Sequence, residues 1–248
     1  HLSVPAVFEA KTIYSLPISK QIIEFNECDV LFSERESIED LKKQKIALGS
    51  IAFAAQYQQQ PSPAEGAIVK KEWFRFYSQV PEKFDEIIQS WDMSFKDSEN
   101  SDYVVGQVWG RIGANKYLLD QVRKKLNFPD TLKAVIDLSN KWPKARRKLI
   151  EDKANGTAII ASLSDKISGI VAISPTESKL ARMSAICPHI EAGNVYLPDS
   201  ISKTWVDDFL NEVLRFPKGK HDDQCDCLSQ ALNDLETRTA GWQYIYGL

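Results

Sequence analysis

Three short apolar runs in the middle of the chain predict neighbouring β-strands. The first run carries a carboxylate, Asp92, close to its end and then gives way to a polar segment. Glycine and asparagine between the second and third runs suit a tight hairpin turn. The runs cover residues 85–95, 103–112 and 116–123. Three strands on short connections predict an antiparallel meander.

Helical and extended patterns alternate after the meander. Apolar spacing and a proline near its start predict a helix over residues 131–142, and the same reasoning assigns the later elements. These are a strand over 148–151, a helix over 156–163, a strand over 168–173, a helix over 176–188, a short extended piece over 195–197, and helices over 203–214 and about 222–236. The order predicts an α/β domain with a mixed five-stranded sheet and helices on both faces. The RNase H-like fold, of the RNase H, integrase and resolvase type, uses this order.

The beginning of the chain follows a different pattern. It reads as irregular and partly extended until Ser37, a suitable N-cap for a helix that ends before Gly49. Residues 51–57 suit a second short helix, and residues 58–63 are polar and broken by proline, as linkers are. We therefore expect two domains. They cover residues 1–70 and 71–248.

Composition and charge argue against several classes of protein. A net charge of −3 and a pI of about 5.7 do not suit a protein that coats nucleic acid through overall basicity. No apolar run approaches the ~18 residues that a membrane span needs, and the N-terminus lacks the apolar core of a signal peptide. The sequence therefore predicts a cytosolic globular protein that does not act at a membrane.

Acidic residues stand where the predicted elements end or begin. They are Asp92 in SWDMSF, Glu151 and Asp152 in LIEDKANG, and Asp222, Asp223 and Asp226 in GKHDDQCD. In the RNase H-like topology the first and fourth strands are neighbours, so Asp92 and Glu151 would emerge at one edge and the last helix would bring Asp223 to them. Three such carboxylates can hold two Mg²⁺ or Mn²⁺ ions, because both metals accept oxygen ligands.

Simpler roles are open to each of these acids. Asp92 and Asp102 could cap turns, and the acids at helix starts could favour the positive end of the helix dipole. Within the last helix, Asp223 and Asp226 are three residues apart and share a face, whereas Asp222 points away from them. This geometry favours Asp223 as a ligand, with Asp226 as an auxiliary.

Basic residues close to the acids are candidates for contact with a DNA backbone. One pair belongs to a basic run that precedes the strand ending at residue 151, and another pair is one turn apart on a predicted helix. The candidates are Lys153, Arg146, Arg147, Lys179 and Arg182. A solvated charged face is the alternative interpretation of each.

Five segments carry a resemblance to a known family. They are 50–77 (SIAFAAQYQQQPSPAEGAIVKKEWFRFY), 90–106 (SWDMSFKDSENSDYVVG), 150–156 (IEDKANG), 190–198 (IEAGNVYLP) and 221–232 (HDDQCDCLSQAL). In this order they are similar to the C-terminal nuclease half of the large terminase subunit of tailed bacteriophages or prophages, over roughly residues 47–235. The chain contains no Walker A sequence, so the family's packaging ATPase would lie upstream, and residues 1–70 would be the end of that motor domain and its linker.

The resemblance implies a metal-dependent endonuclease that cuts concatemeric double-stranded viral DNA by two-metal phosphodiester hydrolysis. It implies metal ligands at Asp92, at the Glu151 and Asp152 pair with Glu151 favoured, at the Asp222 and Asp223 pair, and at Asp102 near the second strand. It also implies that the protein works in the cytoplasm of the bacterial host. Its partners would be double-stranded DNA, the small terminase subunit, the portal protein and the ATPase domain of its own chain.

Two other functions are compatible with the same fold. A resolvase-like or transposase-like nuclease would act on branched or transposon-end DNA. A catalytically silent docking module of the packaging motor would use the acids only for structure. The linker-like segment before Pro61 argues against the resolvase or transposase function, because such enzymes need no motor linker.

Overall fold

The computed structural model describes residues 4–8, 10–16, 19–59, 68–93, 103–153, 155–201 and 203–246. The chain divides into two compact units, residues 1–66 and 67–248, each of which has its own packing. Within the described ranges, no helix is long and apolar enough to cross a membrane.

The first unit combines a small hairpin with a kinked helix. Strands β1 (Thr12–Ser15) and β2 (Ile22–Phe25) pair antiparallel. Helix α1 (Ile38–Gln56) is capped by Ser37, whose hydroxyl accepts a hydrogen bond from the backbone N–H of Asp40 at 3.2 Å. Gly49 interrupts the helix with a φ of 75°, a conformation that glycine adopts readily. The kink lies where the sequence predicts that one helix ends and another follows.

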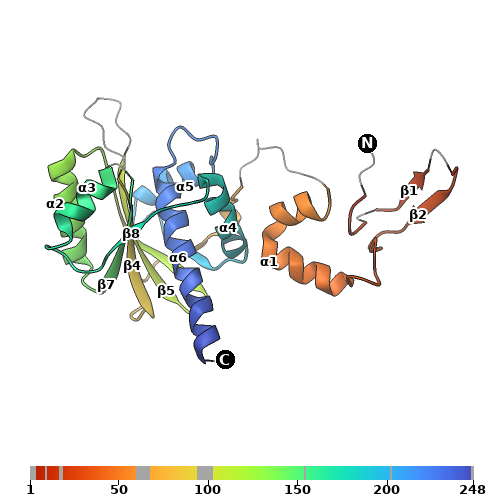
Figure 1. Ribbon diagram of the computed structural model, residues 1–248, viewed down its shortest axis with the longest axis horizontal. Coiled ribbons are helices and arrows are strands. Elements are labelled where there is room, and N and C mark those ends of the chain that lie inside the picture. The colour runs from red at the N-terminus through yellow and green to blue at the C-terminus, as the bar shows by residue number, and fades with distance from the viewer. Residues whose placement is uncertain are drawn as a thin grey trace. The chain divides into compact units, whose positions relative to one another are not determined.

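A mixed sheet organises the second unit (Figure 1). Its strands are β3 (Arg75–Tyr77), β4 (Glu86–Met93), β5 (Val104–Ile112), β6 (Asn115–Lys124), β7 (Ala145–Glu151), β8 (Ile170–Ile173) and β9 (Val195–Pro198). They lie in the order β3-β9-β6-β5-β4-β7-β8. β4, β5 and β6 form the predicted antiparallel meander, and β7 pairs parallel with β4 and with β8. A 3₁₀ turn (Lys71–Trp73) precedes β3.

Helices cover both faces of this sheet (Figure 1). On one face lie α2 (Phe128–Lys141) and α3 (Asn155–Leu163); on the other lie α4 (Lys179–Glu191), α5 (Trp205–Val213) and α6 (Asp223–Tyr246). Side chains alternate along β4, so Ile88 packs toward α4, α5 and α6, whereas Trp91 packs toward α2 and α3. The central strand is therefore buried on both sides.

The predicted fold class is confirmed, with seven strands in place of five. The short extended piece at 195–197 becomes β9, which pairs parallel with β6. β3 pairs parallel with β9 and was not predicted, because three residues are too few to show an alternating pattern. These two strands extend the sheet at the edge away from β4, β7 and β8.

Two ion pairs hold α6 against the strands beneath it. Arg147 of β7 donates to Asp234, and Lys116 of β6 donates to Glu236. Lys116 is almost fully buried, and this burial, reinforced by the charge of Arg111, lowers the pKa of Lys116 to about 8. A buried cation of this kind needs its acidic partner, so the pairs fix where α6 crosses the sheet.

Gly106 of β5 leaves the space that the Trp91 side chain fills. The two residues are cross-strand partners, and a Cβ added at position 106 would lie 2.4 Å from the indole ring. We expect Gly106→Ala to lower the free energy of unfolding in urea by about 1–3 kcal/mol, the usual cost of overpacking. In a Trp91→Leu background the same change should cost clearly less, because the two sites are coupled. Equal costs in both backgrounds would contradict this packing.

Candidate active site

Asp92 stands near the end of β4 and faces α6. It lies on the same face of the strand as Ser90, whose hydroxyl donates to the carbonyl of Cys227 at 2.8 Å. The side-chain amide of Gln230 donates to the same hydroxyl at 2.9 Å. These bonds fasten α6 across β4, so that the first turns of α6 lie beside Asp92.

Glu151 is the last residue of β7 and lies next to Asp92. The two strands run parallel, and Trp91 of β4 is in register with Ile150 of β7. Trp91 and Ile150 both pack toward α2 and α3, so the residues that follow them turn to the opposite face. Strand pairing alone therefore brings these two acids to one end of the sheet.

The start of α6 is held by a buried polar network that the sequence analysis missed. Glu212 of α5 accepts hydrogen bonds from the backbone N–H and the side-chain amide of Gln224, both at 2.6 Å. Arg123 donates to the same carboxylate at 3.2 Å, and Gln121 donates to Gln224 at 2.8 Å. Glu212 thus satisfies a backbone donor in the first turn of α6.

A signal for Glu212 exists in the sequence. It follows Phe209 by three residues and precedes Val213, so it falls on the apolar, buried stripe of α5. A carboxylate on such a stripe requires polar partners. Those partners come from β6 and α6, and no local pattern identifies them.

Asp223 and Asp226 are both buried, each with 5% of its surface exposed. They lie one turn apart at the start of α6, on one face as the sequence predicts. Burial raises the pKa of Asp92 well above its ordinary value, and the charges of Asp226, Asp223 and Glu151 raise it further, while Lys179 opposes the shift. Asp226, Asp223 and Glu151 are thus close enough to Asp92 to disfavour its ionisation.

Basic side chains from α4 lie among these acids. Lys179 Nζ is 2.8 Å from a carboxylate oxygen of Asp222 and 2.5 Å from one of Asp226. Arg182 Nη2 is 2.9 Å from the other oxygen of Asp226, and Arg182 Nη1 is 3.6 Å from Glu151. Burial raises the pKa of Asp226, while its bonds with Lys179 and the charge of Arg182 act in the opposite direction.

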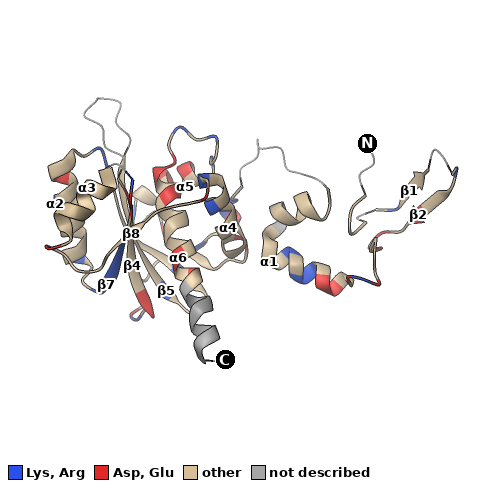
Figure 2. Cartoon of the chain, viewed as in Figure 1, with Lys and Arg blue, Asp and Glu red and all other residues tan. Residues whose placement is uncertain are grey.

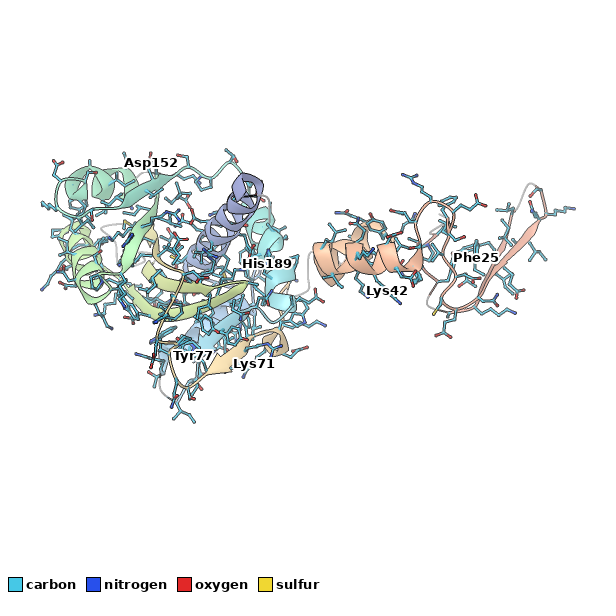
Figure 3. The ribbon with its side chains drawn as sticks, turned by 90° about the horizontal axis from the view of Figure 1, so that it is seen from below. Phe25, Lys42, Lys71, Tyr77, Asp152 and His189 are labelled. Carbon is cyan, nitrogen blue, oxygen red and sulfur yellow. The ribbon has the colours of Figure 1, made fainter. Side chains whose placement is uncertain are left out.

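The other predicted acids have different environments. Asp152 follows β7 (Figure 3) and accepts a hydrogen bond from the hydroxyl of Thr157 at 2.6 Å, so it serves the start of α3. The side chain of Asp222 is 40% exposed and forms an ion pair with Lys179, which also contacts Asp226. Asp102 lies outside the described residues.

Lysines and arginines lie on several elements of the chain, β7 among them (Figure 2), and the predicted basic residues differ in their environments. Lys153 is exposed, and its Nζ lies 2.8 Å from a carboxylate oxygen of Glu151, one of the converging acids. Arg146 is exposed near the start of β7, away from them. Arg147, which the sequence also offers as a DNA contact, is only 15% exposed and forms ion pairs with Glu86 and Asp234 within the fold.

The donor chemistry of this group suits a divalent metal ion. Carboxylate oxygens are the ligands that Mg²⁺ and Mn²⁺ accept. Among the described residues, no three histidine, cysteine or acidic side chains are grouped closely enough to hold a metal ion as they stand. Instead, cations of the protein take up carboxylate oxygens of Asp226 and Glu151.

The family model of the terminase RNase H-like domain matches residues 89–235. The chain belongs to this family. The match includes the carboxyl ends of β4 and β7 and the first half of α6, and so all four converging acids. The prediction of a terminase nuclease domain is confirmed. A comparison with curated proteins found no match.

Solved structures of terminases share the fold. A large terminase from a thermophilic bacteriophage, solved in complex with ADP, matches with a TM-score of 0.62 and 14% identity, over 81% of this chain and 52% of that one. The nuclease domain of the large terminase of Thermus phage P74-26 matches with a TM-score of 0.51 and 17% identity, over 67% of this chain and 93% of that one.

The large terminase nuclease of thermophilic phage G20c, solved with bound zinc, matches with a TM-score of 0.50 and 17% identity, over 68% of this chain and 97% of that one. The present terminase chain spans about half the length of the ADP-bound large terminase. At these identities the likeness shows the fold.

The raised pKa of Asp92 predicts a pH-dependent stability for the metal-free protein. The unfolded chain ionises this group near its ordinary pKa of about 3.9. The stability from Asp92 is therefore complete below about pH 4 and is lost as the pH rises through the folded-state pKa, by ~1.4 kcal/mol for each pH unit of that window. In EDTA, Asp92→Asn should be more stable than the unsubstituted protein at about pH 8 and should lose this advantage near pH 4.

Urea unfolding at a series of pH values measures this difference. Asp137→Asn is the matched control, because Asp137 is exposed on α2. It should show no such trend. An effect of Asp92→Asn that is the same at every pH would contradict the raised pKa.

Proposed function

We propose that this chain is the nuclease part of a phage large terminase and cuts concatemeric double-stranded viral DNA with divalent metal ions. The observation that carries the proposal is the convergence of Asp92, Glu151, Asp223 and Asp226 at the carboxyl ends of β4 and β7. A strand end crowded with carboxylates is costly to maintain. Bound metal ions would offset this cost, because their positive charge neutralises the carboxylates.

Asp92, Glu151 and Asp223 would hold two Mg²⁺ or Mn²⁺ ions, with Asp226 as an auxiliary ligand. When bound, such ions lower the pKa of a water molecule for attack on phosphorus and stabilise the leaving oxygen. The chain itself provides the rigid position of these acids. β4 and β7 fix two of them by register, and Glu212 fixes the others through α6.

The DNA backbone would meet basic residues beside the acids. Lys153 and Lys179 are both about half exposed or more, with 63% and 47% of their side chains accessible. Arg146 is also exposed but lies five residues before Glu151 on β7, so it would touch DNA about 16 Å farther along. Contacts of this kind position the duplex and do not read its sequence.

Membership of the terminase family supports the remaining parts of the proposal. The missing length relative to the thermophilic-phage large terminase, which was solved with ADP, would contain the ATPase domain. The small terminase subunit and the portal protein would be partners in the cytoplasm of the bacterial host. The zinc in the G20c nuclease supports the use of divalent ions.

Conversion of supercoiled plasmid by the purified chain tests the proposal. Cleavage should require Mn²⁺ or Mg²⁺ and stop in EDTA. Asp92→Ala should lower the rate on the order of 100-fold or more, as expected when a preorganised charge in the site is lost. Asp137→Ala, which removes an exposed acid of α2, should leave the rate unchanged. Cleavage that survives Asp92→Ala would contradict the carboxylate site, and no cleavage with any metal would favour the docking module.

A comparison within one acidic pair tests the ligand assignment. Glu151→Gln should abolish most of the cleavage, because it removes a converging carboxylate. Asp152→Asn should change the rate by less than about threefold, since an amide oxygen can still accept from Thr157. The same plasmid assay measures both variants. Equal losses in the two would contradict the preference for Glu151 over Asp152 as the ligand.

A further inference from the structure

Helix α4 is anchored in the fold, and two of its basic side chains contact the acids. Ser178 caps the helix, and Lys179 and Arg182 follow within its first turn. The carbonyl of Arg182 accepts a hydrogen bond from the side-chain amide of Asn233 at 3.0 Å, and Met183 and Ile186 pack in the core that α6 shares. The backbone of α4 is thus anchored to the helix that carries Asp223 and Asp226.

These cations occupy the oxygens that a metal ion would need. Both carboxylate oxygens of Asp226 are taken, one by Lys179 at 2.5 Å and the other by Arg182 at 2.9 Å. Arg182 also reaches an oxygen of Glu151 at 3.6 Å. One guanidinium therefore links acids from α6 and β7, two of the elements that a shared metal centre would connect.

The burial of Arg182 beside the acids is energetically costly. Only 11% of its side chain is exposed, and its Nε is a buried donor that has no hydrogen-bond acceptor within the described part of the chain. A buried charge with an unsatisfied donor is costly. The repulsion that Asp92 receives from Asp226, Asp223 and Glu151 would nevertheless be worse without a countercharge.

We propose that Lys179 and Arg182 are built-in counterions of the acidic site, which divalent ions displace when they bind. This inference rests on the proposed function. The two cations stabilise the metal-free arrangement and at the same time compete with the metal for Asp226 and Glu151. They thereby raise the metal concentration at which the site fills, and they lose these acidic partners when it does.

The sign of one measurement separates competition from a purely structural role. If Arg182 competes, Arg182→Gln should bind Mn²⁺ several-fold more tightly than the unsubstituted chain, because a rival positive charge is gone. If Arg182 only holds the acids in place, its loss should weaken binding. Lys179→Gln should also tighten binding, and its half-exposed position makes it tolerant of substitution.

Free Mn²⁺ measured by electron paramagnetic resonance gives the affinities for the full chain. Arg75→Gln and Lys133→Gln are the matched controls, because they remove the same charges at exposed positions on β3 and α2, outside the acidic site. Both should leave the affinity unchanged. Asp92→Asn should weaken binding and so verifies that the measured ion sits at the acids.

Thermal unfolding provides a second readout. Arg182→Gln should melt below the unsubstituted chain in EDTA and should gain more from saturating Mn²⁺, since a ligand stabilises by its affinity for the folded state. Unchanged or weaker Mn²⁺ binding in both α4 variants, with Asp92→Asn still weakened, would overturn the counterion role and leave the metal site intact. Absence of Mn²⁺ binding, or binding unaffected by Asp92→Asn, would overturn the proposed metal site and the counterion role together.

Discussion

The parallel pairing of β4 with β7 is the constraint on which the candidate site depends. These strands are not adjacent in sequence, yet their register sets Trp91 beside Ile150. The next residue of each strand is then an acid on the opposite face of the sheet. Trp91 and Ile150 both pack on the α2 and α3 side, and a slip of one residue would turn Trp91 to the opposite face of the sheet, where α4, α5 and α6 pack. The packing that stabilises the domain therefore also fixes the distance between Asp92 and Glu151.

The acids that α6 contributes to the site, Asp223 and Asp226, depend on how this helix is placed on the sheet. Polar attachments at several turns hold this helix, among them Glu212 at its first turn, Ser90 at Cys227 and Gln230, Arg147 at Asp234, and Lys116 at Glu236. The hydrogen bonds of Glu212 and Ser90 are buried and the two ion pairs are partly buried, so each costs free energy when a partner is missing. An apolar interface alone would tolerate sliding of the helix along the sheet. Polar contacts at successive turns allow only one position of α6 on the sheet. This position also fixes where Asp223 and Asp226 lie.

Local patterns in the sequence predict most of the domain. The remaining features depend on contacts between residues that are far apart in the sequence, and local patterns do not reveal these contacts. The meander, the alternating helices and strands and the acids at their ends follow from apolar spacing, so the fold class and the grouping of Asp92 with Glu151 could be anticipated. Arg147 looked like part of a basic run, but its role is decided by Asp234, which is 87 residues away. Glu212 and Gln224 were missed for the same reason, because their meaning arises only when α5, α6 and β6 are packed together. β3 is too short to be seen without β9 beside it.

Charge balance at the site explains how a protein with a net charge of −3 can act on DNA under the proposed function. Lys153, Lys179 and Arg182 are each engaged by an acid of the site. In this state their positive charge is largely cancelled, and the region offers little attraction to a phosphate backbone. Divalent ions bound to the same carboxylates would neutralise the acids and leave these side chains unpaired, since bound cations reverse the local field. The positive potential that draws DNA would then appear only where and when the site is filled with metal, so that affinity for DNA and competence to cut it arise together.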